Sequence, residues 1–271
     1  MWPVALLAMA IWRHATVAIA AHGTDIAYHR RGGLKGRAYG VYLALGARLC
    51  RRCILIANSR ATASVVADAG WTRSEVLLLG TDLHAASIER RHNGKLLFAG
   101  RLIPRKGCGW FTREVLPKLP GSISLQVAGT DWGGELSRLP EPDRVEFLGN
   151  LSPQDLAKAY SRALAVIVPN LDDVNGEYEG FGLVAAEAAA CGAVVLASDH
   201  GGLRDAVLDG VTGQLLPPGD ADAWVNAIEK VMSLTASERE ERQERARQAA
   251  IRRFSWDAYA LAVSDLLTNT R

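Results

Sequence analysis

Glu179-Gly-Phe-Gly-Leu-Val-Ala-Ala-Glu187 is the stretch that decides the fold: two carboxylates flank a glycine-bracketed turn. An apolar run at 164–168, closed by Pro169, precedes it, and an alanine-rich run to Cys191 follows. This order predicts a strand, a loop and a helix, and a helix N-terminus presents free backbone N–H groups to an anion. Each carboxylate can accept paired hydrogen bonds from neighbouring hydroxyls. The stretch therefore predicts a site for a molecule with a diphosphate, a ribose and a hexose, which is a nucleotide sugar.

Further short motifs follow one another along the chain. They are His22-Gly-Thr-Asp25, Asn58-Ser59, Gly80-Thr-Asp82, Gly100-Arg101 with Lys106-Gly107, Cys191-Gly-Ala-Val-Val195, Gly201-Gly202, Gly210-Val-Thr-Gly213 and Phe254-Ser-Trp256. With the 179–187 stretch, this ordered set resembles the retaining glycosyltransferases of the GT-B fold, the large family-4 group (glycosyl transferases group 1). Each motif alone is weakly specific, but together they cover nearly the whole chain. The resemblance implies an α/β, GT-B-like fold with two Rossmann-like domains.

Composition fits this fold class without deciding it. The chain has 271 residues, 49% hydrophobic and 22% charged, which is enough for one large or two small domains. Four cysteines do not make a disulfide framework, so a reducing, cytoplasmic compartment is expected. The apolar segment 1–12 is too short to span a bilayer and is expected to form a buried helix, with a signal anchor as the alternative.

Short apolar strands separated by helices indicate parallel sheets covered on both faces. Strands are expected at 16–21, 53–57, 76–79, 96–99, 124–128, 145–148, 164–168 and 194–197. The polar segment 83–93 is interpreted as a linker. We therefore expect an acceptor-side domain at 1–88 and a nucleotide-sugar-binding domain at 89–254. The resemblance implies that a last helix, within 255–271, packs back on the first domain.

The first predicted domain is short, because a Rossmann-like half usually needs well over about 100 residues. Similar proteins carry more strands and a glycine-rich acceptor loop before the motif that begins at His22. The N-terminal domain is therefore expected to be incomplete, whether the chain is a fragment, its start was assigned late or the domain is naturally short. An open sheet edge there predicts self-association or a partner, and poor transfer.

Two cations follow the predicted strand that ends at Gly100. Arg101 and Lys106 can neutralise a diphosphate, and the resemblance implies that they grip that of the donor. It also implies that Glu179 contacts the sugar hydroxyls and Glu187 the ribose. The other donor-binding positions that it implies are Asn150, Leu151, Gly180, Phe181, Gly182 and Leu183.

His22 is the second catalytic candidate beside Glu179. A lone histidine is more often structural, but this one ends a predicted strand, and in similar enzymes it lies beside the transferred sugar and the acceptor. The resemblance implies protein cations in place of a metal, so no metal and no cofactor is expected. Asp172-Asp173 is interpreted as a solvated pair, and Cys50-Arg-Arg-Cys53 is given no function because it lacks a second cysteine pair.

Charge is concentrated at the start of the chain. The net charge is +2, yet residues 1–60 carry nine arginines and lysines against Asp25 alone. One interpretation is a solvated basic surface; the other is a face within residues 30–52 that docks on anionic lipid, at the inner face of a membrane, or on an acidic acceptor. Nucleic acid is not expected as a partner, because no binding motif accompanies the charge.

The sequence thus predicts a retaining hexosyltransferase that moves a hexose from a nucleotide sugar to a glycan or lipid-linked acceptor. Two other classes stay open. One is a regulatory or partner-dependent protein that binds the nucleotide sugar but does not transfer it. The other is a dinucleotide-dependent Rossmann enzyme, which is disfavoured because Ala99-Gly-Arg-Leu102 lacks the G-x-G-x-x-G turn. The base, the sugar, the acceptor and the linkage are not fixed by the residues.

Overall fold

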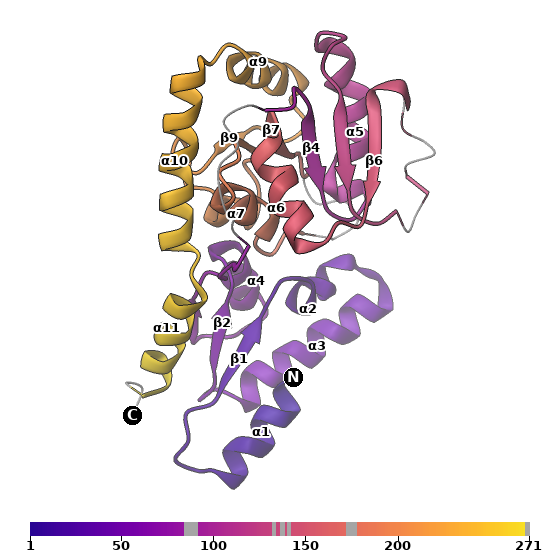
Figure 1. Cartoon of the computed structure of the whole chain (residues 1–271). Helices are drawn as coiled ribbons and strands as arrows, with labels where there is room; N and C mark the ends of the chain where they lie inside the picture. Colours follow the sequence, from indigo (N-terminus) through magenta and orange to yellow (C-terminus); the bar gives the residue numbers. More distant parts are fainter. Residues whose placement is uncertain (84–91, 132–133, 136–138, 140–141, 172–177, 269–271) are drawn as a thin grey trace. The chain divides into compact units, whose positions relative to one another are not determined.

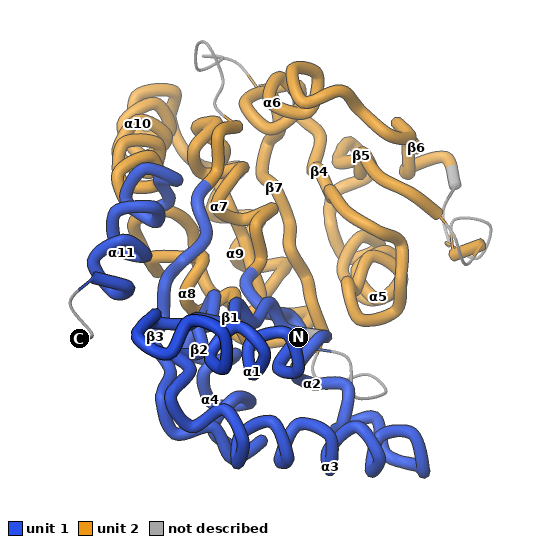
Figure 2. Tube along the Cα trace, turned by 90° about the horizontal axis from the view of Figure 1, so that it is seen from below, with its two compact units in different colours: residues 1–80, 173–181, 254–271 blue, residues 81–172, 182–253 orange. Residues whose placement is uncertain are grey.

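The computed structural model describes residues 1–83, 92–131, 134–135, 139, 142–171 and 178–268. The chain divides into two compact units, coloured separately in Figure 2. Unit 1 comprises residues 1–80, 173–181 and 254–271, and unit 2 comprises 81–172 and 182–253. Each unit pairs helices with a parallel sheet (Figure 1), which confirms the predicted α/β class.

Unit 1 is built on a parallel sheet of order β1-β2-β3 among the described residues. Its strands are β1 (Ala18–Ala21), β2 (Ile54–Ala57) and β3 (Ser74–Val76). Its helices are α1 (Trp2–Ile11), α2 (Thr24–Ala27), the 3₁₀ helix η1 (Tyr28–Arg31), α3 (Gly33–Leu49), α4 (Arg60–Asp68) and α11 (Trp256–Thr268). The central strand β2 is buried along its whole length, as its unbroken apolar run predicts. The strand predicted at 76–79 was misplaced, because β3 contains the exposed Glu75 and offers no apolar run.

The prediction of a buried first helix was wrong. Helix α1 forms, but of its residues only Ala5 is fully buried, whereas Val4 is 72% exposed. The helix contacts α3 through Trp2, which packs so closely on Gly46 that an added Cβ there would lie 2.6 Å from the indole Cγ. A helix can present only one face to its support, and α1 is apolar on all sides, so its other face remains in solvent.

Unit 2 contains a six-stranded parallel sheet within its described residues, of order β6-β5-β4-β7-β8-β9. The strands are β4 (Leu96–Ala99), β5 (Leu125–Ala128), β6 (Val145–Gly149), β7 (Ala165–Val168), β8 (Val195–Ser198) and β9 (Gln214–Leu216). Five of them match predicted strands to within one residue at each end. Strand β9 was not predicted, because three residues that begin with a glutamine give no apolar run.

The strand order of unit 2 reverses once. From β4 the chain adds β5 and β6 on one side and then returns to add β7, β8 and β9 on the other. From the carboxyl ends of the adjacent strands β4 and β7, the chain therefore continues toward opposite edges of the sheet. In open α/β sheets, ligands bind at this position, outside the carboxyl ends of the strands.

Helices cover both faces of this sheet. They are the 3₁₀ helices η2 (Pro104–Lys106), η3 (Leu116–Lys118) and η5 (Pro142–Arg144), and the α-helices α5 (Cys108–Glu114), α6 (Pro153–Arg162), α7 (Leu183–Ala190), α8 (Leu203–Ala206), α9 (Ala221–Met232) and α10 (Ala236–Arg253). Among the described residues, no helix is long and apolar enough to cross a bilayer.

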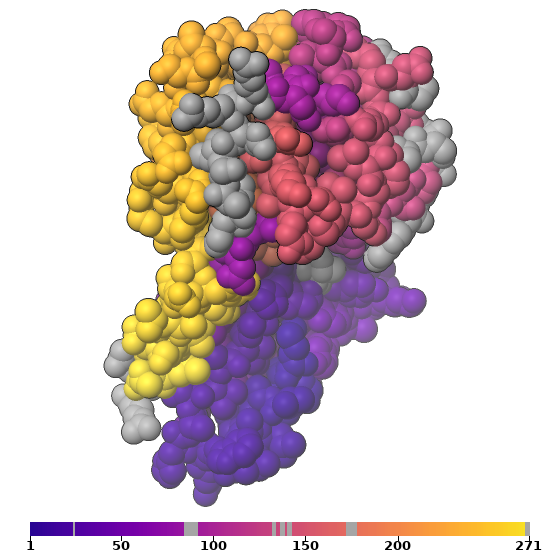
Figure 3. Space-filling view, in the orientation of Figure 1, coloured from indigo at the N-terminus to yellow at the C-terminus, as the bar shows by residue number. Residues whose placement is uncertain are grey.

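The sequence of residues 236–253, with Glu238/Arg242 and Glu241/Arg245 at i,i+4 spacing, predicts a solvent-facing helix. The outer face of α10 does lie on the surface of unit 2 (Figure 3). Its inner face nevertheless buries Arg239 and Gln243. The Arg239 guanidinium donates to the carbonyls of Ala163, at 3.2 Å, and Leu164, just beyond α6. Burial lowers the pKa of Arg239 to about 10. Carbonyl groups at a helix end need donors, and here a side chain from another helix supplies them.

Candidate functional site

The predicted cation pair lies at the carboxyl end of β4. Arg101 is exposed, directly after Gly100, and Lys106 is half-buried in η2. Arg105 is adjacent to Lys106 but does not match the family pattern. It is only 7% exposed, and its carbonyl accepts a hydrogen bond from the Leu171 backbone N–H at 2.9 Å. The spacing of charges alone could not distinguish the buried Arg105 from the exposed Arg101 and the half-buried Lys106.

The loops after β4 and β7 are in contact. A Cβ added at Gly107, at the end of η2, would lie 2.8 Å from the carbonyl carbon of Pro169, which directly follows β7. Only a residue without a side chain fits between these two backbones. Lys106 is therefore held beside the strand end where the sheet order reverses, and Arg101 directly follows the other strand of that pair.

Helix α7 begins at the same edge of the sheet. It lies in the chain between β7 and β8, two adjacent parallel strands, so its N-terminus is at their carboxyl ends. Gly182 precedes it with φ 99°, in the left-handed region that favours glycine, and Leu203 packs where a side chain would stand. Five alanines of α7 are buried, whereas Leu183 is exposed. The helix is thus packed closely into unit 2, and its first turn remains accessible.

Glu187 is a half-buried carboxylate on α7. The hydroxyl of Tyr160, which is fully buried, donates to Glu187 Oε2 at 3.5 Å. Burial raises the pKa of Glu187 above its ordinary value, and the Tyr160 hydroxyl opposes that shift. A desolvated carboxylate with one long hydrogen bond has spare acceptor capacity. Two adjacent hydroxyls of a ribose would supply the missing donors.

Asn150 and Leu151 stand apart from these groups. They follow β6, the edge strand, and β5 separates that strand from β4. Asn150 is exposed and Leu151 half-buried. The topology therefore places Arg101 and Lys106 after β4, where the strand order reverses. It places Asn150 and Leu151 two strands away, after β6 at the side of the sheet.

In unit 1, the turn around His22 contacts the start of the 179–187 stretch. The His22 side chain is exposed at the end of β1, and its backbone N–H donates to Asp25 Oδ1 at 3.0 Å. The His22 carbonyl accepts a hydrogen bond from Asn58 Nδ2 at 3.1 Å. A Cβ added at Gly180 would lie 3.1 Å from the carbonyl carbon of His22 and 3.2 Å from the Cα of Gly23. The two backbones meet without space for a side chain.

Hydrogen bonds from buried side-chain hydroxyls hold the His22 turn and the backbone at Gly180 together. Ser59 Oγ donates to the Gly180 carbonyl at 2.6 Å and accepts the Thr62 backbone N–H at 3.0 Å. Ser59 is thus the N-cap of α4, as the pair Asn58-Ser59 directly after a strand predicts. The Thr62 hydroxyl donates to Asn58 Oδ1 at 2.7 Å and contacts the hydroxyl of Tyr178, whose pKa burial raises. Sequence reasoning missed Tyr178, because it lies in a polar stretch without periodicity. Its one signal was its position directly before Glu179.

The 179–187 stretch is divided between the units. Glu179, Gly180 and Phe181 group with unit 1, and the residues from Gly182 group with unit 2. Glu179 is half-buried, and Phe181 is buried against Phe254 of unit 1, with ring centroids 5.9 Å apart in an edge-to-face arrangement. Phe181 therefore anchors the start of the stretch against Phe254.

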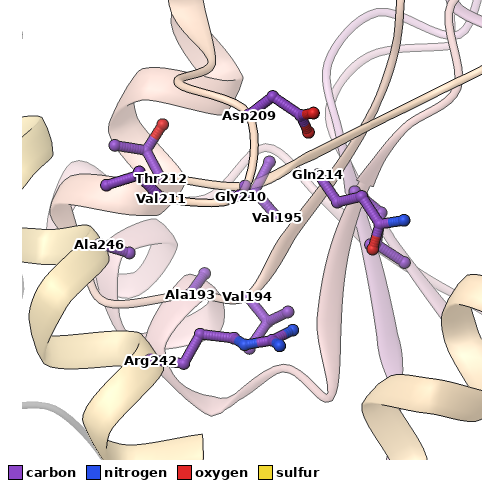
Figure 4. Close-up of a pocket in the computed structure, with 12 residues that line it drawn as sticks. Ala193, Val194, Val195, Asp209, Gly210, Val211, Thr212, Gln214, Arg242 and Ala246 are labelled. Atoms are coloured by element: carbon purple, nitrogen blue, oxygen red, sulfur yellow. The ribbon is translucent and has the colours of Figure 1, made fainter.

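A cavity in unit 2 lies elsewhere. About 280 Å³ in volume, it is lined by the starts of β8 and β9 and by Arg242 of α10, which extends beside Val194 (Figure 4). It occupies the amino ends of the strands, opposite the edge that carries Arg101. The motif 210–213 borders it and forms a closed turn, in which the Gly210 N–H donates to the Gly213 carbonyl at 2.8 Å. The turn explains why the two glycines of this motif stand at positions 210 and 213.

The acidic pair and the cysteine pair of the sequence differ in what the structure describes of them. No group of three histidine, cysteine, aspartate or glutamate residues there is placed to hold a metal ion. The pair Asp172-Asp173 and most of the predicted linker lie outside the described residues. Cys50 and Cys53 are buried, and burial raises the pKa of Cys53 to about 11, so its thiolate is scarce at neutral pH.

Residues 93–233, more than half of the chain, match the family model described as glycosyl transferases group 1. The D-inositol 3-phosphate glycosyltransferase of Mycobacterium marinum is 34% identical over 192 residues, which cover 64% of this chain and 40% of that protein. The protein of the same description from Mycobacterium tuberculosis H37Ra is 37% identical over 173 residues, covering 59% and 34%. This chain therefore spans two fifths or less of the length of these relatives.

Solved structures share the fold. Anabaena Alr3699/HepE in complex with UDP-glucose superposes with a TM-score of 0.76 at 24% identity, covering 99% of this chain and 76% of that one. Sucrose-phosphate synthase from Thermosynechococcus elongatus gives 0.76 at 23% identity, covering 98% and 71%. These likenesses confirm the GT-B type of fold. The matches favour transferases over the alternative of a binding protein without transfer.

Proposed function

Because this chain belongs to the glycosyl transferases group 1 family, we propose that it transfers a hexose from a nucleotide sugar to a glycan or lipid-linked acceptor with retention of configuration. One observation carries the proposal: the unit 2 sheet reverses its strand order where Arg101 and Lys106 follow β4 and where α7 begins. Cations and a helix N-terminus at such a point suit a diphosphate.

On this proposal, loss of the nucleoside diphosphate is the step that unit 2 promotes. Negative charge grows on the phosphate oxygens as the glycosidic bond breaks. Arg101, Lys106 and the backbone N–H groups that follow Gly182 stabilise that charge, because they are fixed before the reaction. Glu187 holds the ribose hydroxyls, and Leu183, Asn150 and Leu151 provide further contacts to the donor.

Unit 1 contributes the acceptor side. The family resemblance supports Glu179 as the contact to the hydroxyls of the transferred hexose and His22 as the second catalytic residue. Ser59 and Tyr178 are positioning residues, because their hydroxyls hold the backbone on either side of Glu179. The family resemblance supports attack by the acceptor hydroxyl on the face that the nucleotide leaves. Protein cations serve in place of a metal, so donor binding is metal-independent.

A screen for donors tests the proposal. The complex of HepE makes UDP-glucose the first donor to try, beside GDP- and ADP-hexoses, and the relatives' name makes inositol phosphate a first acceptor. A rise in unfolding temperature with one nucleotide sugar, together with hydrolysis or transfer, is the expected result. NMR of the product gives the anomeric configuration. Failure of every nucleotide sugar and free nucleotide to bind the folded chain would overturn the proposal.

A further inference from the structure

Helix α3 presents an apolar face to solvent. Leu34 is 85% exposed and Val41 is 70% exposed, and Leu45 and Leu49 are exposed by nearly half. At about 100° per residue, these side chains and Ala38 fall within an arc of roughly 80° that runs the length of the helix. Single exposed leucines are normal on a protein surface. A continuous stripe over this length requires a partner or a function.

The core of unit 1 does not account for the stripe. The residues of α3 that face the core are Gly36, Leu43, Gly46 and Ala47, and they lie on the opposite side of the helix. The helix is therefore apolar both where it packs and where it does not. Its inner face is explained by the fold, and its outer face is not.

Cations border the stripe on both sides. Lys35 lies on one border, and Arg37 and Arg48 lie on the other, when the helix is viewed down its axis. None of the three forms an ion pair among the described residues. The sequence has no aspartate or glutamate from residue 26 to residue 67. An apolar stripe between cations, on a helix without an acidic residue, is typical of a helix that lies in the interface of a membrane.

Helix α1 adds a second apolar surface to the same unit. Val4, Leu7 and Ile11 recur on one face and are exposed, and the exposed Trp12 follows them. Trp2 of α1 packs on Tyr42 and Gly46, in the C-terminal half of α3, and so joins the two helices. Tryptophan at the edge of an apolar surface is common at the depth of lipid head groups.

We propose that the outer faces of α3 and α1 dock unit 1 on an anionic lipid bilayer, with the apolar side chains in the interface and Lys35, Arg37 and Arg48 on lipid phosphates. Charge favours lipid over a second copy of this chain, because a symmetric contact would bring these same cations together. The docking does not require transfer activity, so its failure and the failure of the proposed function are separate results.

Co-sedimentation with vesicles tests the docking. Full-length protein is mixed with phosphatidylcholine vesicles, with and without 30% phosphatidylglycerol, at low and high salt. Binding is expected only with the anionic lipid and is expected to fall with salt. The double variant Arg37→Gln/Arg48→Gln should bind about 25-fold more weakly, since each cation near such a surface contributes about fivefold. Arg113→Gln changes an exposed arginine of α5 in unit 2; it is the matched charge control and should bind like the wild type.

The apolar stripe has its own control. Leu34→Ser/Val41→Ser should lower binding by about tenfold or more, because fewer CH₂ groups enter the interface. Leu261→Ser changes a leucine of α11 that is 67% exposed and should have no effect. The native cysteines are buried, so a fluorophore on Val41→Cys labels the stripe selectively, and its emission should shift to the blue on anionic vesicles.

Three results would overturn the proposal. One is equal binding to neutral and anionic vesicles, and another is a fluorophore at position 41 that stays in water while the protein is bound. The third is a dimer in light scattering that Leu34→Ser/Val41→Ser dissociates, without any binding to vesicles. That result would assign the stripe to a second copy.

Discussion

Gly180→Ala tests the contact that joins the His22 turn to the 179–187 stretch. The added Cβ would lie 3.1 Å from the His22 carbonyl carbon, 3.2 Å from the Gly23 Cα and closer still to the His22 oxygen. Ordinary contact begins at about 3.4 Å, and every atom in the way belongs to a backbone. No side chain can rotate aside, so one loop must move.

The size of the effect follows from that geometry. Overpacking in a filled site typically costs 1–3 kcal/mol, and immovable backbone on the opposing side places this substitution near ~2–3 kcal/mol. Movement of the loop also stretches the bond from Ser59 Oγ to the Gly180 carbonyl, which is 2.6 Å long. A buried hydrogen bond of this kind contributes about 1 kcal/mol, so part of the total is this bond. Gly180 has no positive φ, so the cost is steric.

Gly121→Ala is the matched control, because a Cβ there meets no atom within 4 Å and its φ is not positive. Thermal unfolding followed by circular dichroism should show a loss of stability for Gly180→Ala and little change for Gly121→Ala. If the proposed site is right, Gly180→Ala also loses transfer and still binds the nucleoside diphosphate, because the diphosphate ligands belong to unit 2. Two variants that unfold and react alike would refute the reasoning.

Three further predictions concern the donor. Glu179→Ala should abolish transfer and leave calorimetric binding of the nucleoside diphosphate nearly intact; weakened diphosphate binding would contradict the assignment to the sugar. Arg101→Ala/Lys106→Ala should weaken binding of the nucleoside diphosphate by several kcal/mol if the site is partly desolvated. Neither Arg113→Ala nor saturating EDTA should weaken it. A strict need for magnesium or manganese would argue against protein cations as the diphosphate ligands. The raised pKa of Glu187 means that its carboxylate, the form that accepts ribose hydroxyls, is lost as pH falls through that pKa, so nucleotide affinity should fall there. Glu187→Gln should flatten this pH profile, and an unchanged profile would assign it to another group.

The same raised pKa sets the sign of a stability effect. The folded chain binds the Glu187 proton more tightly than the unfolded chain does. The free energy of unfolding therefore falls as pH rises from the unfolded pKa through the folded pKa, because burial then opposes the charge. A carboxylate that binds a ligand is expected to lower stability in this way, because burial removes its hydrogen bonds to water. The hydroxyls of a bound ligand would replace those hydrogen bonds.

Sequence patterns predicted the elements that are apolar, short and regular. The strand Leu96–Ala99 and the helix Ala236–Arg253 were predicted with the observed bounds. A fully buried strand gives an unbroken apolar run, and a charged helix gives oppositely charged residues at i,i+4 spacing. Strand β3 was misplaced because Glu75 interrupts the signal. Arg239 was taken for a surface charge, since nothing local shows that carbonyls from another helix need its guanidinium.

The site was predictable where backbone geometry dictates the residue. Gly182 marks a left-handed turn before α7, and Ser59 marks the start of α4, so both were legible in the sequence. The polar network was not, because Thr62 and Tyr178 are far apart in the chain and meet only after folding. The burial of Arg105 and the exposure of Arg101 were equally hidden, since both are arginines in the short segment between β4 and α5.

The two carboxylates of the 179–187 stretch look like one motif, yet the fold holds them by different means. Glu179 lies on backbone fixed by hydroxyls of unit 1, whereas Glu187 lies on a helix packed into unit 2 beside Tyr160. Gly182, the first residue after the division, is a glycine with a backbone conformation that few other residues adopt. One motif therefore supplies a carboxylate to each unit, and each carboxylate depends on a different set of contacts.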